Sequence, residues 1–199
     1  MVRATRKLVE GGAMGWRKIL EAEHRLVLEV ADAAEAECRH IEETGAVRAD
    51  LVGDMIGFFR YFNDGLHDPK EEGLLFARCH RRGMTEDDEP LEQMIGEHEW
   101  CRGKLDGLER TLERMDPGDR AAALSFSASL REFIQVVRCH IEVEEEVFFD
   151  TAQHYLTAND RRELTEEFEA VHWDEVEEGV ASYWEDLAHR LYMAEVRSV

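Results

Sequence analysis

The sequence predicts an all-α fold, in which four helices form an up-down-up-down bundle and an additional helix follows at the C-terminus. Five stretches carry apolar residues at every third or fourth position, and no strand-like alternation of useful length lies between them. The breaks between these stretches coincide with glycine, proline or acidic turn residues. With 199 residues, of which 44% are hydrophobic, the chain is long enough to form one domain with a substantial core.

The first two helices are predicted over residues 14–43 and from Ala49 into the eighties. Gly45 suits the C-terminal cap of the first helix, because glycine readily adopts the left-handed conformation of that position. The second helix has an apolar inner face that is rich in phenylalanine. That face contains Leu51, Met55, Phe58, Phe59, Phe62 and Leu66.

Pro69 lies inside the second predicted helix and removes one backbone donor from it. Two compatible interpretations follow. In the first, the proline kinks the helix and sets the angle between His67 and Glu71. In the second, the helix restarts there, with Asp68 as its N-cap and Glu71 completing a capping box.

Three further helices are predicted downstream. The third opens at Leu91, directly after a proline, and stops before Pro117. The fourth extends over residues 119–155. Thr157 begins the segment that can cap a fifth helix, which is expected to reach to about Ala194.

We therefore divide the chain into an N-terminal tail (1–13), the helical bundle (14–156) and a C-terminal helix (157–199). The C-terminal helix is expected to pack on the bundle or on a partner, and the second arrangement would give a homo-oligomer. The basic N-terminus is not followed by an apolar run, so no signal peptide is expected. No stretch approaches the length of a transmembrane helix.

The composition disfavours several classes of partner. A net charge of −21 argues against nucleic acids and anionic membrane surfaces, because both select basic patches. The four cysteines form no Cys-x-x-Cys pair, so neither structural-zinc spacing nor a c-type haem attachment is present. Cysteines of this kind are typical of reduced thiols, and we expect a cytoplasmic protein.

A repeated motif carries the functional prediction. His67-x-x-x-Glu71 and His140-x-x-x-Glu144 share the extended pattern His-x-x-x-Glu-Glu-x-(Leu/Val)-(Leu/Phe)-Phe. Residues i and i+4 lie on one face of a helix, so each copy presents an imidazole and a carboxylate to the same point. That is how a helix supplies two metal ligands to the interior of a bundle.

Each copy follows a lone histidine at nearly the same distance. His24 lies 43 residues before His67, and His98 lies 42 residues before His140. In so acidic a chain a glutamate four residues after a histidine is expected by chance, so the number of motifs alone proves nothing. The matched register of the two halves predicts a shared site, because a bundle brings its four helices around one centre.

Four imidazoles and two carboxylates form a ligand set suited to iron, manganese or zinc. If Glu71 and Glu144 each bridge two metals, each ion receives two histidine nitrogens and two carboxylate oxygens. An oxo or hydroxo bridge then leaves about one open position on each octahedral ion. We therefore expect two iron ions per chain and a small ligand such as O2, NO or peroxide. Glu72 and Glu145 lie further round their helices, where they support the ligands or face solvent.

These residues resemble the hemerythrin family, specifically its HHE cation-binding branch. The similarity covers residues 15–155 and includes Phe76 and Phe149, which end the two motif copies. It implies a four-helix bundle with a non-haem di-iron centre. The resemblance assigns the metal ligands to His24, His67, Glu71, His98, His140 and Glu144.

Two departures from the oxygen carriers of that family affect the expected function. Those carriers have a second histidine four residues after the third-helix histidine, where this chain has Arg102. They also use aspartate where this chain has Glu144. The departures argue against simple reversible O2 carriage and predict two near-equivalent, more open metal sites. The resemblance then favours O2 or redox sensing, NO handling, iron homeostasis or peroxide chemistry.

Three alternatives remain open. The centre could belong to an enzyme that acts on peroxide or oxidises a small substrate, although no acid, base or electron donor stands out. Glu21-x-x-His24 and Glu169-x-x-His172 mimic the motif of ferritin-like di-iron proteins, and His172 could be an additional ligand. A structural bundle without metal would explain the apolar stripes but not the matched ligand pairs.

Overall fold

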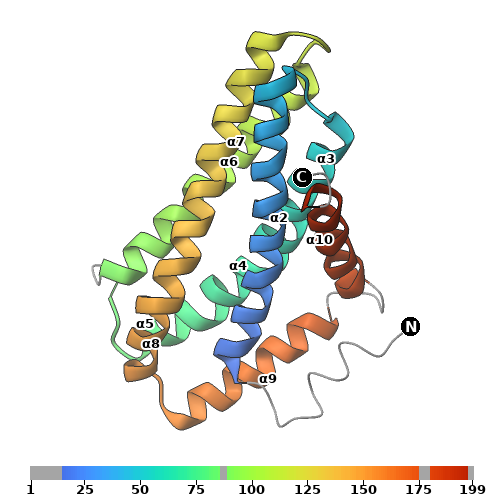
Figure 1. Ribbon diagram of the computed structural model, residues 1–199. Coiled ribbons are helices and arrows are strands. Elements are labelled where there is room, and N and C mark those ends of the chain that lie inside the picture. Colours follow the sequence, from blue (N-terminus) through green and yellow to red (C-terminus); the bar gives the residue numbers. More distant parts are fainter. Residues whose placement is uncertain (1–14, 86–88, 175–179, 197–199) are drawn as a thin grey trace.

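The computed structural model describes residues 15–85, 89–174 and 180–196, and these residues are almost entirely helical. Four long helical segments lie side by side and alternate in direction (Figure 1), so the predicted all-α bundle is confirmed. Three of the described helical segments are π-helical and are labelled η. The elements are α2 (Trp16–Thr44), α3 (Ala49–Phe58), η1 (Phe59–His67), α4 (Asp68–Lys70), η2 (Glu71–Phe76), α5 (Ala77–Arg81), α6 (Glu89–Arg114), α7 (Arg120–Val143), η3 (Glu144–Phe148), α8 (Phe149–Tyr155), α9 (Ala158–Asp174) and α10 (Val180–Val196).

The ends of the bundle helices follow local backbone chemistry. Gly45 caps α2 with a φ of 73°, and its N–H donates to the carbonyl oxygen of Ile41, as the sequence predicted. The carboxylate of Asp119 accepts a hydrogen bond from the N–H of Ala122 and so caps α7. These caps hold the turns in which the helices reverse direction.

The second bundle helix runs from α3 to α5 without a break, and the capping box predicted at Pro69 does not form. Asp68 has helical backbone angles, and its side chain accepts a hydrogen bond from Asn63 Nδ2 at 2.9 Å. The N–H of Asp68 donates to the carbonyl of Asn63, five residues back, in the π-helical pattern. Because no helix end exists here, Asp68 has no terminus to cap, and the carboxylate of Glu71 is fully buried instead.

Two apolar clusters fill the bundle, one toward each end. Along α2, Leu20 belongs to the lower cluster and Val27 to the upper one, and His24 lies between them. The upper cluster includes Val27, Val30, Phe58, Phe59, Phe62, Phe126, Phe133, Val137 and Ile141. The lower cluster includes Trp16, Leu20, Leu75, Phe76, Leu91, Met94, Phe148, Phe149 and Phe168. The polar residues between the clusters are thereby enclosed on both sides.

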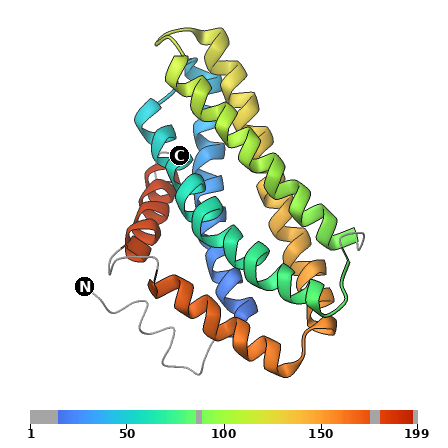
Figure 2. The same cartoon turned by 180° about the vertical axis from the view of Figure 1, so that it is seen from behind.

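The segment after the bundle contributes two described helices. Helix α9 crosses the lower end of the bundle, and α10 lies along α2 and α3 (Figures 1 and 2). Phe168 of α9 is buried in the lower cluster, whereas Leu187 and Leu191 of α10 are buried in the upper cluster. These three apolar side chains are therefore buried against the bundle of the same chain.

Asp160 joins the start of helix α9 to the bundle through hydrogen bonds with Arg82. Thr157 and Asp160 form a reciprocal capping box, with Thr157 N–H donating to Asp160 Oδ2 at 2.8 Å and Asp160 N–H donating to Thr157 Oγ1 at 3.2 Å. Arg82 donates to both Asp160 oxygens, at 2.8 and 2.9 Å. These hydrogen bonds hold the pKa of Asp160 well below its ordinary value, the Arg82 guanidinium contributing most.

We expect Asp160→Asn to lower the free energy of unfolding at neutral pH, because an amide cannot accept the same charge-assisted hydrogen bonds. Since the folded-state pKa of Asp160 is depressed, its contribution is present above the ordinary aspartate pKa of about 4 and is lost as the pH falls further. Urea unfolding should therefore show a difference in the free energy of unfolding between wild type and Asp160→Asn that becomes smaller below about pH 4. A difference that stays constant in acid would contradict this assignment, and the exposed Glu166→Gln is the control with little expected effect.

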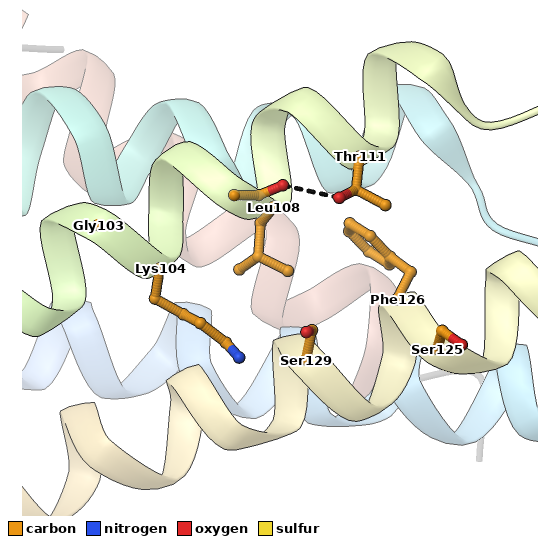
Figure 3. Close-up of a pocket in the computed structure, with 8 residues that line it drawn as sticks. Gly103, Lys104, Leu108, Thr111, Ser125, Phe126 and Ser129 are labelled. Atoms are coloured by element: carbon orange, nitrogen blue, oxygen red, sulfur yellow. Dashed lines mark hydrogen bonds between the residues drawn. The ribbon is translucent and has the colours of Figure 1, made fainter.

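A groove of about 290 Å³ lies between α6 and α7 (Figure 3). It is bordered by the small residues Gly103 and Gly107 of α6 and by Ser125 and Ser129 of α7. The groove shares no residue with the buried polar layer between the two apolar clusters. In the part of the chain that the structure describes, none of the helices combines the length and the apolar character that crossing a membrane requires.

Candidate metal centre

The four predicted histidines meet between the two apolar clusters. His24 comes from α2, His67 ends η1, His98 comes from α6 and His140 from α7. The Nε2 atoms of His24 and His67 lie 3.1 Å apart, and those of His98 and His140 lie 3.0 Å apart. Each lone histidine is thus paired with the histidine that follows about 42 residues later, a pairing that the structure adds to the shared centre predicted from the register.

Glu71 and Glu144 lie between the two histidine pairs. Glu71 Oε1 is 2.9 Å from His67 Nε2, and Glu71 Oε2 is 3.2 Å from His98 Nε2. Glu144 Oε2 is 3.1 Å from His24 Nε2 and 4.0 Å from His140 Nε2. Each carboxylate therefore faces both pairs, in the arrangement expected of a bridging ligand.

The carboxylates of Glu71 and Glu144 are fully buried, so their negative charge has to be compensated by a nearby cation. Within the described residues, none of their four oxygens has a hydrogen-bond partner. A buried carboxylate that accepts no hydrogen bond of good geometry is costly unless a cation compensates its charge, and either protonated imidazoles or metal ions can supply that cation here. All six predicted residues thus form a donor set that fits a metal pair, and groups of their donor atoms lie within 4.8 Å of one another.

The pKa values at the centre show how strongly these groups interact. Burial and the negative charge of Glu71 raise the pKa of Glu144. Burial also acts to raise the pKa of Glu71, but the neighbouring imidazoles, His67 above all, outweigh it and lower that pKa well below its ordinary value. Burial lowers the pKa of His67 and His98, and the adjacent carboxylates reverse this to about 9 and about 11 respectively. Protons thus offset the buried negative charge, and metal cations can take their place.

A second carboxylate orients each imidazole from its other nitrogen. Such a partner accepts the Nδ1–H and leaves the Nε2 lone pair directed at the centre. These contacts are 2.7–2.9 Å long. They join His24 to Glu145, His67 to Glu23, His98 to Glu72 and His140 to Glu97.

Comparison with known families agrees with this geometry. The profile described as the hemerythrin HHE cation binding domain matches residues 17–152, about two thirds of the chain. The chain belongs to this hemerythrin family. The resemblance found in the sequence is confirmed, and with it a cation-binding bundle. No curated protein sequence matches the chain significantly.

Two of the orienting glutamates of this hemerythrin domain were not recognised in the sequence. Glu23 precedes His24 and Glu97 precedes His98, so the dipeptide Glu-His occurs at the same place in both halves. Each of these glutamates contacts the histidine of the neighbouring bundle helix rather than its own neighbour in sequence. The repeated dipeptide was the available signal, but a periodicity argument along one helix cannot reveal a contact between helices.

The phenylalanines that end the two motif copies also have a role in the geometry. Glu71 and Phe76 lie five residues apart across η2, and Glu144 and Phe149 lie five apart across η3 and the start of α8. Phe149 stacks on His24 with ring centroids 6.0 Å apart, and Phe76 stacks on His98 at the same distance. Because hydrogen bonds in a π-helix join residues five apart, such a turn brings residues at this spacing toward one side. Each phenylalanine covers one imidazole from below.

Arg102 does not enter the centre. Its guanidinium donates to Asp64 Oδ1 and to Glu72 Oε1, both at 2.6 Å. Arg102 therefore neutralises the carboxylate that orients His98. In the position where the oxygen carriers place a fifth histidine, this hemerythrin domain has a guanidinium that cannot bind a metal.

The first of the two ferritin-like motifs, Glu21-x-x-His24, does not form a pair of neighbouring metal ligands. Glu21 Oε1 accepts a hydrogen bond from Arg17 Nε at 2.7 Å, and Glu21 does not join the six-residue donor set. The helix of His172 is α9, but the side chain of this residue lies outside the described part of the structure. Its suggested role as an additional ligand stays a prediction.

Proposed function

We propose that this hemerythrin domain binds two iron ions, joined by an oxo or hydroxo bridge, and that the centre binds or senses a small molecule such as O2, NO or peroxide. One ion is assigned to His24 and His67 and the other to His98 and His140, with Glu71 and Glu144 shared. The observation that carries the proposal is the convergence of four Nε2 atoms on two buried carboxylates whose oxygens lack hydrogen-bond partners within the described residues. When bound, iron supplies open coordination positions and reversible electron transfer.

The surrounding residues support this role. The carboxylates on the Nδ1 side fix the orientation of the imidazoles before a metal arrives, which lowers the cost of binding. The upper and lower apolar clusters exclude bulk water, and so strengthen electrostatic interactions at the centre. A mixed histidine and carboxylate set favours iron, manganese or zinc over copper(I).

The test is anaerobic loading of metal-free protein with Fe(II), followed by metal analysis and spectroscopy on exposure to O2. We expect about two iron ions per chain and the near-ultraviolet absorption of an oxo-bridged pair. Protein that takes up no iron, or only zinc, would overturn the proposal. Titration with NO and peroxide then separates a binding or sensing role, with tight reversible binding, from the alternative of an enzyme that consumes peroxide.

A further inference from the structure

Lys70 is a fully buried cation that lies next to the candidate metal centre but outside its set of ligands. Its Nζ atom donates a hydrogen bond to Glu23 Oε1. The other oxygen of this carboxylate, Oε2, lies 2.9 Å from Nδ1 of His67. Glu23 therefore joins Lys70 to a candidate metal ligand through two different oxygens, and the three side chains form a continuous chain of polar contacts.

The other three carboxylates that orient imidazoles have no buried cation of this kind among the described residues. Glu97 accepts a hydrogen bond from Gln93, whose amide is neutral. Glu72 accepts one from Arg102, but these two side chains are 34% and 33% exposed. Glu145 is also partly exposed, at 36%. Solvent weakens the effect of such exposed charges, whereas the buried ion pair acts in a medium of low dielectric constant.

The stability of the bundle does not by itself explain this ion pair. A buried ion pair contributes little net stability, since apolar side chains of similar volume in its place often give an equally stable protein. Leu20 and Val27 lie three residues before and four residues after Glu23 on α2, and both are fully buried in the apolar clusters. The core thus offers apolar surroundings on either side of Glu23, and the position of the two charges behind His67 indicates a role at the centre.

The charges of this pair act on the electron-donating strength of His67. A carboxylate that accepts the Nδ1–H of a metal-binding imidazole makes that imidazole a stronger donor. Lys70 draws negative charge from Glu23 and so limits this effect. Its own positive charge also disfavours additional positive charge nearby. Both effects favour the less positively charged state of a metal ion at the centre.

From these observations we propose that Lys70 is a positioning residue that raises the reduction potential of the iron centre through Glu23 and His67. Reduction of Fe(III) to Fe(II) adds one electron and removes one unit of positive charge, and the buried ammonium group favours that change. Glu23 alone acts in the opposite direction, because its negative charge favours Fe(III). The inference rests on the proposed binding of iron and deepens it, because it names residues that set how readily the centre takes up electrons.

Two substitutions at this ion pair should shift the reduction potential in opposite directions. We expect Lys70→Met to shift the equilibrium toward Fe(III) by about tenfold, which is about 59 mV for a one-electron step. Glu23→Gln should shift it toward Fe(II), because the change removes a negative charge and leaves a weaker acceptor for His67. Lys18→Met removes the same charge at an exposed position and should leave the equilibrium within about twofold of wild type.

The measurement is a redox titration of the iron-loaded protein with dithionite, followed by near-ultraviolet absorption, after the iron content of each variant has been determined. A loosened fold would admit water to the centre in both variants and move the potential in one direction, so opposite shifts identify an effect of charge. Lys70→Gln keeps a hydrogen-bond donor for Glu23 and should give the same shift as Lys70→Met if the latter does not fold.

Shifts of Lys70→Met and Glu23→Gln in the same direction would overturn the inference. An unchanged potential in iron-loaded Lys70→Met or Lys70→Gln would also overturn it, and both results would leave the proposed function intact. Wild-type protein that takes up no iron would overturn the proposed function, and this inference with it.

Discussion

Replacement of Glu71 by glutamine should reduce the iron content from about two ions per chain to fewer than one. Glu71 faces three of the four imidazoles, at 3.6 Å from His24 Nε2, 2.9 Å from His67 Nε2 and 3.2 Å from His98 Nε2. Both proposed ions share this carboxylate, so its loss removes a donor and a negative charge from each. Glutamine keeps the size of the side chain but carries no charge.

The measurement is metal analysis of the variant after anaerobic loading with Fe(II), alongside a circular dichroism spectrum. A native helical spectrum with little iron separates the loss of a ligand from loss of the fold. Glu146→Gln is the control, because Glu146 is exposed and belongs to the same acidic run as Glu144. A Glu71→Gln variant that retained about two ions would remove Glu71 from the ligand set.

The helices and the six central residues could be predicted because their signals are local. Apolar periodicity predicts helices, and the i, i+4 spacing of His67 and Glu71 places both on one face. The register of the two halves added the only long-range information, which related His24 to His67 and His98 to His140. The structure gathers all six residues, as a bundle with that register requires.

Other features depend on contacts between helices and could not be predicted. The residues around Asp68 match the sequence pattern of a capping box, but no capping box forms there. The side chain of Glu71 is buried in the centre, and the backbone continues through Asp68 in a π-helical pattern. Glu23 and Glu97 looked like two acids among many in a very acidic chain. Their roles follow only from the neighbouring helices, where His67 and His140 donate to them.

Lys70→Met is expected to lower the free energy of unfolding of the metal-free protein by about 3–5 kcal/mol, the cost of breaking a buried ion pair. Lys70 is completely buried and pairs with Glu23, itself 5% exposed. Methionine retains the apolar stem and most of the length, so the change removes the charge and little packing. Glu23 would then keep only its contact with His67 in the interior.

Urea unfolding at neutral pH measures the loss, with the exposed Lys18→Met as a control expected to stay within about 0.5 kcal/mol of wild type. Adding Glu23→Gln to Lys70→Met should recover part of the loss, because no unpaired carboxylate then remains. Equal stabilities of Lys70→Met and Lys18→Met would show that Glu23 needs no buried cation.

The asymmetry of the repeat explains why only one half carries this lysine. Lys70 lies three residues after His67, and the residue three after His140 is Val143. Glu97, the partner of His140, is partly exposed and accepts a hydrogen bond from Gln93, so solvent and an amide suffice to balance its charge. Glu23 is sealed from solvent and requires an internal cation to remain ionised beside His67. The buried lysine thus accompanies the more enclosed of the two histidine pairs, since the side chains of His24 and His67 are 1% and 3% exposed and those of His98 and His140 are 4% and 10% exposed. Its removal should therefore be costly, whereas a change at Val143 has no charge to disturb.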